Sequence, residues 1–274
     1  MNKTLIWIFA VIITIGAAYF QRKTGPTYPK KVKLEISDSI YEAKLIRSSN
    51  NNHDAKIEIN IPDSSITGRV NFKLFPIKDE WKSIDFVREG DFLLAYLPKQ
   101  PAAGKLEYYI TFENLKNSSD KFETDHVIIR FKGDVPAWAM IPHILFMFAA
   151  MLLSTIAGLF ALVKNKSQRL YGILTLTFLI IGGFILGPII QHYAFGDAWT
   201  GVPFGWDLTD NKTLIGVVFW IIAVWANYKK QNYKLTIIAS VVLFLIYIIP
   251  HSLLGSEFDY EQGKVVTGLI TWVF

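Results

Sequence analysis

The sequence predicts a mixed fold: an extracytoplasmic β-sandwich fused to an α-helical membrane bundle of four spans, preceded by an N-terminal signal anchor or signal peptide. Three observations predict it. Hydrophobic residues make up 51% of the 274 residues, which is more than a soluble enzyme of this length carries. The charged residues, 19% of the chain, concentrate between residues 21 and 134. Apolar residues alternate with period two up to residue 131 and then form long runs. We therefore expect a first part in water and a second part in the membrane.

Charge and cysteine content limit the chemistry. Much of the formal net charge of +5 lies in short loops beside apolar runs, where it orients a membrane protein, so we expect no nucleic-acid partner. The chain has no cysteine, which excludes disulfides, Cys-ligated zinc, iron–sulfur clusters, c-type haem and thiol nucleophiles. No Walker A, Gly-x-Ser-x-Gly or His-Glu-x-x-His motif occurs, so nucleotide, serine-hydrolase and zincin chemistry lack support.

The N-terminal segment, residues 1–22, reads as a signal anchor or a cleavable signal peptide. Lys3 precedes Leu5–Phe20, a run of about 16 apolar or small residues that is short beside the roughly 20 of a spanning helix. Gly16, Ala17 and Ala18 suit a cleavage site, so both outcomes stay open. Either one exports the domain that follows, residues 23–134.

Period-two alternation predicts about eight short strands in residues 23–134, a number typical of β-sandwich domains. They are Val32–Ile36, Tyr41–Ile46, Ala55–Ile61, Val70–Leu74, Trp81–Phe86, Phe92–Leu97, Leu106–Phe112 and His126–Phe131. The segment Pro101–Tyr109, with its turn and paired tyrosines, resembles the turn and tyrosine-bearing strand of immunoglobulin-like and fibronectin III-like domains. This resemblance implies an immunoglobulin-like sandwich and says nothing about function.

Four apolar runs predict the spans of the membrane domain, residues 135–274: Val135–Val163, Leu170–Ile190, Thr213–Tyr228 and Leu235–Leu254. Basic residues occupy two loops on one side and acidic residues the other, which places the basic loops in the cytoplasm. The basic set is Lys164, Lys166, Arg169, Lys229, Lys230 and Lys234, and the acidic set is Asp197, Asp207, Asp210, Glu257, Asp259 and Glu261. We therefore expect a plasma (inner) membrane protein with its β-sandwich and C-terminus outside. The short apolar tail Val265–Phe274 is expected at the outer interface or against the bundle.

Three histidines form the candidate ligand or metal site. His143 and His251 both follow an Ile-Pro pair, and His192 follows the third run. At about 1.5 Å per helical residue they lie roughly 30, 24 and 33 Å from the cytoplasmic ends of their helices, within one outer layer. They could ligate haem b or, with Asp207 or Asp210, a divalent metal, or they could relay protons. The alternative is that they are interfacial residues without a ligand.

The connection 191–212 between the third and fourth runs is a candidate lid over this site, because it is long and rich in aromatic residues and glycine. Trp199 and Trp206 would form an apolar wall, and Asp207 and Asp210 would supply charge. The alternative is an interfacial aromatic belt, with Thr209 or Asp210 as a helix N-cap.

Two main hypotheses follow. In the first, the protein is a membrane-embedded binding or redox-associated component with its working site at the outer face. In the second, it is a non-catalytic interaction or assembly protein, whose β-sandwich binds an extracytoplasmic protein or sugar-like ligand while the helices anchor it. A third, an intramembrane enzyme, would use Asp207, Asp210 or Glu257 beside the histidines. The apolar runs lack deep Asp, Glu, Lys or Arg, which disfavours ion-coupled transport.

Overall fold

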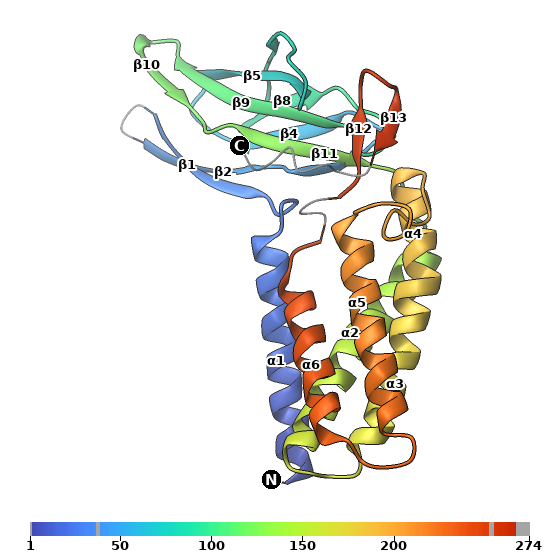
Figure 1. The fold of residues 1–274 in the computed structure, drawn as a ribbon. Helices are drawn as coiled ribbons and strands as arrows, with labels where there is room; N and C mark the ends of the chain where they lie inside the picture. The colour runs from blue at the N-terminus through green and yellow to red at the C-terminus, as the bar shows by residue number, and fades with distance from the viewer. Residues whose placement is uncertain (1, 37–38, 252–254, 267–274) are drawn as a thin grey trace. The chain divides into compact units, whose positions relative to one another are not determined.

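The computed structural model describes residues 2–36, 39–251 and 255–266. Contacts within the chain define two compact units. The helix unit contains residues 2–26, 135–251 and 255–256 of the described chain. The β unit contains Thr27–Asp134, apart from residues 37–38, together with Glu257–Val266. Figure 1 shows both units, which are described separately below.

Three sheets of the β unit share one hydrophobic core. The largest has the order β3-β11-β9-β5-β6, with β10 also pairing with β9; a second has the order β4-β8-β7, and β1 pairs with β2. All pairs are antiparallel except β11 with β3. The alternating apolar residues point inward, and all three sheets contribute to the core. The strands are β1 (Lys30–Ile36), β2 (Ser39–Leu45), β3 (Ser48–Asn50), β4 (Ala55–Asn60), β5 (Ile66–Phe75), β6 (Lys82–Asp85), β7 (Val87–Glu89), β8 (Phe92–Leu97), β9 (Lys105–Asn114), β10 (Asn117–Glu123) and β11 (Val127–Lys132).

A hairpin from the C-terminal part of the chain completes the β unit. Strands β12 (Glu257–Asp259) and β13 (Lys264–Val266) pair antiparallel. The Phe258 N–H donates to the Ala103 carbonyl at 3.2 Å, and the Tyr260 hydroxyl accepts from the Lys105 N–H at 3.0 Å. Glu257 forms a buried ion pair with Lys105. The sequence-based division assigned residues 257–266 to the membrane domain, whereas their contacts lie in the β unit. Residues 267–274 of the predicted apolar tail lie outside the described residues.

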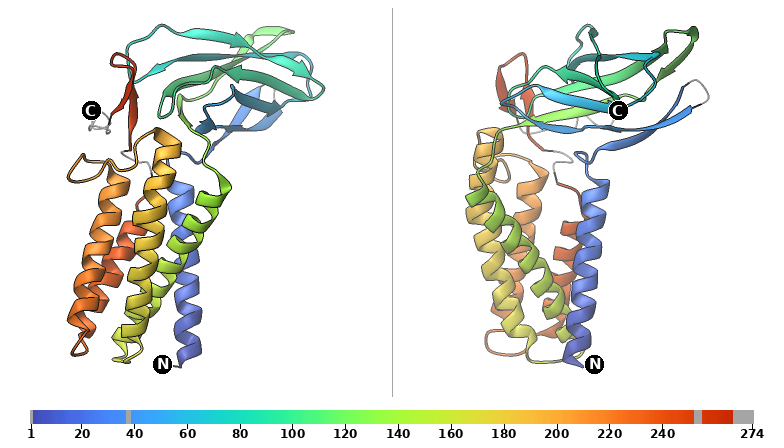
Figure 2. Two further views of the ribbon diagram at one scale, coloured as in Figure 1. Left: turned by 90° about the vertical axis from the view of Figure 1, so that its right-hand side faces the viewer. Right: turned by 180° about the vertical axis from the view of Figure 1, so that it is seen from behind.

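The helix unit consists of apolar helices that lie side by side (Figure 2). They are α1 (Lys3–Thr24), α2 (Ala137–Leu162), α3 (Gln168–Leu179), η1 (Ile180–Leu186), α4 (Gly187–Phe195), α5 (Leu208–Ala226) and α6 (Tyr233–Ile248). Four helical runs of the described chain are long and apolar enough to cross a membrane: α1, α2, the continuous run Gln168–Phe195 and α5. Helix α6 is shorter. The last predicted span was drawn to Leu254, but the helix ends at Ile248, and residues 252–254 lie outside the described residues.

Helix α1 packs against the helix unit through one stripe. Its buried residues Ile6, Ala10, Thr14 and Ala17 recur at helical spacing, as expected for one face of a helix. Ile6 and Ala10 share a small core with two residues of α2, Ile156 and Phe160, and Trp7 meets Tyr171 of α3 edge to face, with ring centroids 5.9 Å apart. In this structure, α1 therefore has a specific packing partner.

Small residues set the close approach of the other helices. A Cβ on Gly172 of α3 would lie 3.0 Å from the ring of the fully buried Trp220 of α5. The π-helical segment η1 contains Gly182 and Gly183, where a Cβ would meet Met147 of α2 at 2.9 Å and Thr213 of α5 at 2.6 Å. These contacts show close packing of the π-helical segment against α2 and α5.

Candidate functional site

The helix unit has two chemically different ends. The loop end consists of residues 196–207, 249–251 and 255–256, and the turn end consists of residues 163–167 and 227–232, which join α2 to α3 and α5 to α6. The predicted connection 191–212 is shorter than expected, because α4 continues to Phe195 and α5 begins at Leu208. Gly196 terminates α4 with a φ of 95°, a left-handed conformation that favours glycine.

Asp207 forms hydrogen bonds both with the start of α5 and with the chain that follows α6. It is the N-cap residue, and its Oδ1 accepts from the N–H groups of Thr209 (2.8 Å) and Asp210 (3.3 Å). Its Oδ2 accepts from the N–H (3.1 Å) and the hydroxyl (3.4 Å) of Ser256. The sequence placed the N-cap at Thr209 or Asp210, which is wrong; Asp207 holds that position because its carboxylate reaches the first free N–H groups of the helix.

Asp210 is a buried acceptor for the loop. Its Oδ2 accepts from the Thr200 N–H at 2.7 Å and from the Thr200 hydroxyl at 3.3 Å. Gln191 of α4 donates to the same hydroxyl at 2.6 Å. Each of the two buried aspartates therefore accepts several hydrogen bonds from its own surroundings, which is the usual condition for burying a carboxylate.

Lys212 is the residue that the sequence analysis missed. It is only 4% exposed, and its Nζ donates to the carbonyl oxygens of Ile249 (2.8 Å) and Pro250 (3.4 Å) at the end of α6. It also interacts electrostatically with Asp207. No carboxylate of the described residues lies within ion-pair distance of it. Its position five residues after an aspartate, at the start of an apolar run, was the available signal.

The structure brings His143 and His251 together with Lys212, and leaves His192 apart. His251 interacts electrostatically with both Lys212 and His143. The half-buried His143 places Nδ1 2.9 Å from the Gly182 carbonyl of η1; because a carbonyl only accepts, Nδ1 carries the proton and Nε2 stays open. His251 is exposed and has no hydrogen bond to a described residue.

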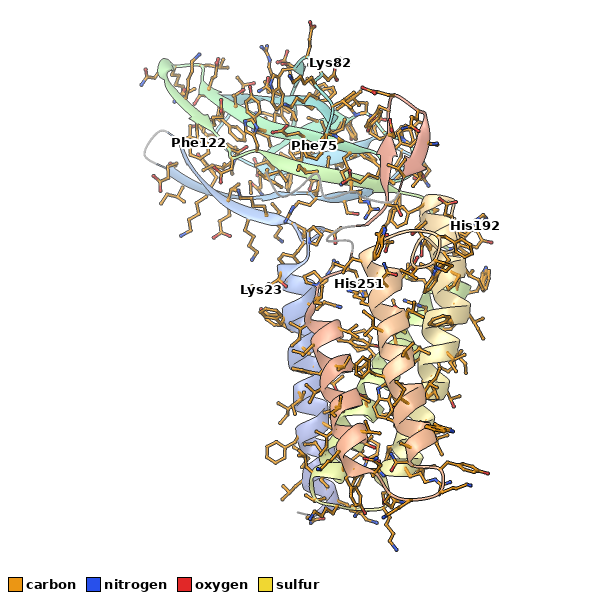
Figure 3. The ribbon with its side chains drawn as sticks, viewed as in Figure 1. Lys23, Phe75, Lys82, Phe122, His192 and His251 are labelled. Atoms are coloured by element: carbon orange, nitrogen blue, oxygen red, sulfur yellow. The ribbon has the colours of Figure 1, made fainter. Side chains whose placement is uncertain are left out.

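His192 lies on α4, and Figure 3 shows it and His251 on different elements at the loop end. Its Nδ1 lies 2.7 Å from the Gly196 carbonyl. It lines a shallow depression with four other residues of α4 and the loop: Pro188, Ile189, Tyr193 and Ala198. Within residues 2–36, 39–251 and 255–266, no three His, Asp or Glu side chains are grouped so as to hold a metal ion.

The two candidate tryptophans of the loop differ in environment. Trp199 packs its ring on Phe184 of η1, with centroids 5.2 Å apart, and donates to the Val202 carbonyl at 3.2 Å. Trp206 is 78% exposed, and its neighbour Phe204 is 80% exposed. Trp199 therefore stabilises the loop, whereas Trp206 and Phe204 present aromatic surface outward.

A comparison with protein families and with curated proteins finds no match to this chain. Its function must therefore be argued from its own residues.

Proposed function

We propose that this is a multi-pass membrane protein of the plasma (inner) membrane whose β unit is an exported, immunoglobulin-like sandwich. The nineteen residues of α5 give a length of about 28 Å, close to the roughly 30 Å hydrocarbon core. Exposed aromatic residues mark both ends, Trp206 and Phe204 at the loop end and Trp225 and Tyr228 at the turn end, as in the two aromatic belts of spanning proteins. The basic side chains near the turn end support a cytoplasmic placement of that end.

One feature argues for a variant of the immunoglobulin pattern. Tyr108 is buried and its hydroxyl donates to the Ile46 carbonyl at 2.8 Å. In a tyrosine corner the acceptor lies only a few residues upstream. The three sheets around one core support the sandwich, while the tyrosine here ties β9 to the end of β2.

The loop end of the helix unit, in this proposal, binds an anionic small molecule through Lys212, His251 and His143. The observation that carries it is the buried Lys212 with no carboxylate in ion-pair distance among the described residues. The aspartates beside it already accept several hydrogen bonds each. The groups with unused capacity are nitrogens: the third N–H of Lys212, Nε2 of His143 and the ring of His251. A buried ionisable group in a helical membrane bundle is a functional-site candidate, and a carboxylate or phosphate would complement these groups.

Haem b is the second candidate, favoured by the bond from His143 to the Gly182 carbonyl. Metal-ligating histidines usually donate their other ring N–H to such a partner. A divalent metal is less suitable, because the cationic Lys212 interacts with His251 and would repel it. The residues present offer two imidazoles for a haem iron, and the Lys212 ammonium would suit a propionate.

The test is equilibrium dialysis of the full chain in detergent against radiolabelled inorganic phosphate and acetate. Wild type is expected to retain about one equivalent of one anion, and Lys212→Met to lose it, since the charge is removed at similar length. Lys212→Arg should retain binding, and His53→Ala, in a turn of the β unit, is the matched control for the histidine variants. His251→Ala should weaken binding about tenfold, the loss of one charge-assisted hydrogen bond.

Two outcomes would contradict the anion site: no retention of either anion by wild type, or equal retention by Lys212→Met. The absorption spectrum of the same preparations tests the haem candidate. A Soret band that is lost in His143→Ala and His251→Ala but kept in Lys212→Met would replace the anion by haem.

A further inference from the structure

A second group of side chains, in the β unit, forms an aromatic patch on the outer face of the six-stranded sheet. It consists of Trp81, just before β6; Tyr109 of β9; and His126, just before β11. The Tyr109 and His126 rings stack, with centroids 4.7 Å apart and planes at 4°. Trp81 meets both edge to face, at 4.9 and 5.3 Å. None of the three rings belongs to the hydrophobic core of the unit.

Two charged residues hold the rings of this patch in place. Glu107 accepts from the Nδ1 of His126 at 2.7 Å and pairs with Lys73 at 3.1 Å. The Lys73 ammonium lies 4.8 Å from the centre of the Trp81 ring. Lys73 and Glu107 cancel each other's charge, so the patch is close to neutral. Each ring touches two neighbours, and a surface fixed in this way loses little conformational entropy when it binds.

The sheet continues beside the rings with neutral polar groups. Asn71 of β5 pairs across the sheet with Tyr109 and with Ser83 of β6. Its side chain accepts from the Ser83 hydroxyl at 2.7 Å and donates to the Thr111 hydroxyl at 3.4 Å. Asn71 is only 8% exposed, so the groups of this row open to a ligand are the hydroxyls of Ser83 and Thr111, which both donate and accept and match a ligand that itself carries hydroxyl groups.

We propose that the aromatic patch is a binding site for a neutral glycan. A sugar ring offers a face of C–H groups to the 40% exposed Trp81 and hydroxyls to the polar row beside it. The neutral charge of the patch gives no attraction for phosphate or acidic glycans. A peptide that adds to the sheet as an extra strand cannot pair with β9, because β9 is already paired along both of its edges. This site is independent of the one at the loop end of the helix unit.

The test uses the full chain in a detergent without a sugar headgroup, passed over insoluble cellulose, chitin and mannan. Wild type is expected to be retained on at least one matrix and eluted by the matching soluble oligosaccharide. Trp81→Ala should weaken retention about tenfold or more, the scale of one aromatic contact. Trp225→Ala removes an exposed tryptophan of the helix unit and should change nothing.

Tyr109→Phe keeps the ring stack and should retain binding, which separates loss of the contact from loss of the fold. The melting temperature of each variant is measured in parallel. The proposal is overturned if folded wild type is retained on none of the three matrices, or if folded Trp81→Ala binds as well as wild type. Retention on heparin alone, abolished by salt, would also overturn it and indicate an electrostatic site.

Discussion

Two lysines of this protein are buried, one in each unit, and they are buried in different ways. Lys105 of the β unit is 8% exposed and forms an ion pair with Glu257. Lys212 of the helix unit is 4% exposed and donates to two carbonyl oxygens, with no carboxylate of the described residues in ion-pair distance. The Lys105 charge is in contact with an opposite charge, whereas the Lys212 charge contacts only carbonyl dipoles and interacts with Asp207 from beyond ion-pair distance.

This difference separates structural from functional burial. A buried ion pair whose partners are both present has no capacity left for a ligand, and its removal affects stability. A buried ammonium held by carbonyl groups has no carboxylate in contact with it, and an anion can supply that contact. The comparison assigns Lys105 to the architecture of the β unit and Lys212 to the site that we propose.

The largest effect is expected for Glu257→Ala. It leaves Lys105 buried without its carboxylate, which costs about 3–5 kcal/mol of unfolding free energy for the β unit. Chemical denaturation of the full chain, followed by tryptophan fluorescence, measures it. Glu58→Ala breaks the exposed pair with Lys56 and should give no resolvable change; comparable losses in the two variants would refute the structural role of the buried pair.

The two lysines can be compared directly by changing each to methionine. Lys105→Met leaves Glu257 buried without its lysine and should cost about 3 kcal/mol or more. Lys212→Met removes a desolvated charge and two hydrogen bonds, and should cost only about 1–2 kcal/mol. The same denaturation experiment ranks them. The reverse order would mean that Lys212 is mainly structural.

Asp207 provides a test of the loop end that leaves Lys212 in place. Asp207→Ala loses the cap of α5 and should lower stability by about 1–2 kcal/mol, whereas Asp207→Asn keeps a capping side chain and should lose less. Limited proteolysis of residues 196–207 measures the local opening. Equal cleavage of wild type and Asp207→Ala would show that the cap does not hold the loop.

The smallest effect is expected from alkaline pH. Burial lowers the pKa of Lys105 below its usual 10.5, against the raising effect of Glu257. The unfolded chain then binds more protons, so stability rises with pH up to about 10.5. Burial raises the pKa of Tyr260 to about 12, so its contribution falls between pH 10 and 12. Melting temperatures are measured across this pH range. The rise with pH should be lost in Lys105→Met, and the fall between pH 10 and 12 should be lost in Tyr260→Phe. An unchanged pH dependence in both variants would contradict both assignments.

Local hydrophobic pattern predicted most of the secondary structure. Each of the eight predicted strands overlaps an observed one, because alternation is a property of neighbouring residues. The strands that were missed lack that pattern: β3 and β10 lie in polar segments, β7 has only three residues, and β12–β13 is a short hairpin beyond the last helix. The π-helical segment was not predicted.

The site was less predictable, because it depends on contacts between distant residues. The three histidines were predicted to share one layer. Their spacing in the sequence does not predict that His143 and His251 interact, or that His192 forms a hydrogen bond at the end of its own helix. Asp207 and Asp210 were identified as site residues. Their hydrogen bonds show that Asp207 caps α5 and that Asp210 accepts from Thr200 of the loop. The ion pair of Lys105 joins residues 152 positions apart, and a pattern of neighbouring residues cannot predict a contact over such a separation.

The C-terminal hairpin has a consequence for biosynthesis. The ribosome makes the first eleven strands before helices α2 to α6, yet the β unit needs Glu257–Val266, which are made after them. Until those residues arrive, Lys105 has no Glu257 and the Ala103 carbonyl has no Phe258 donor. The β unit therefore reaches its final form only after the last helix has been translated, and a chain that stops after α6 lacks the hairpin β12–β13.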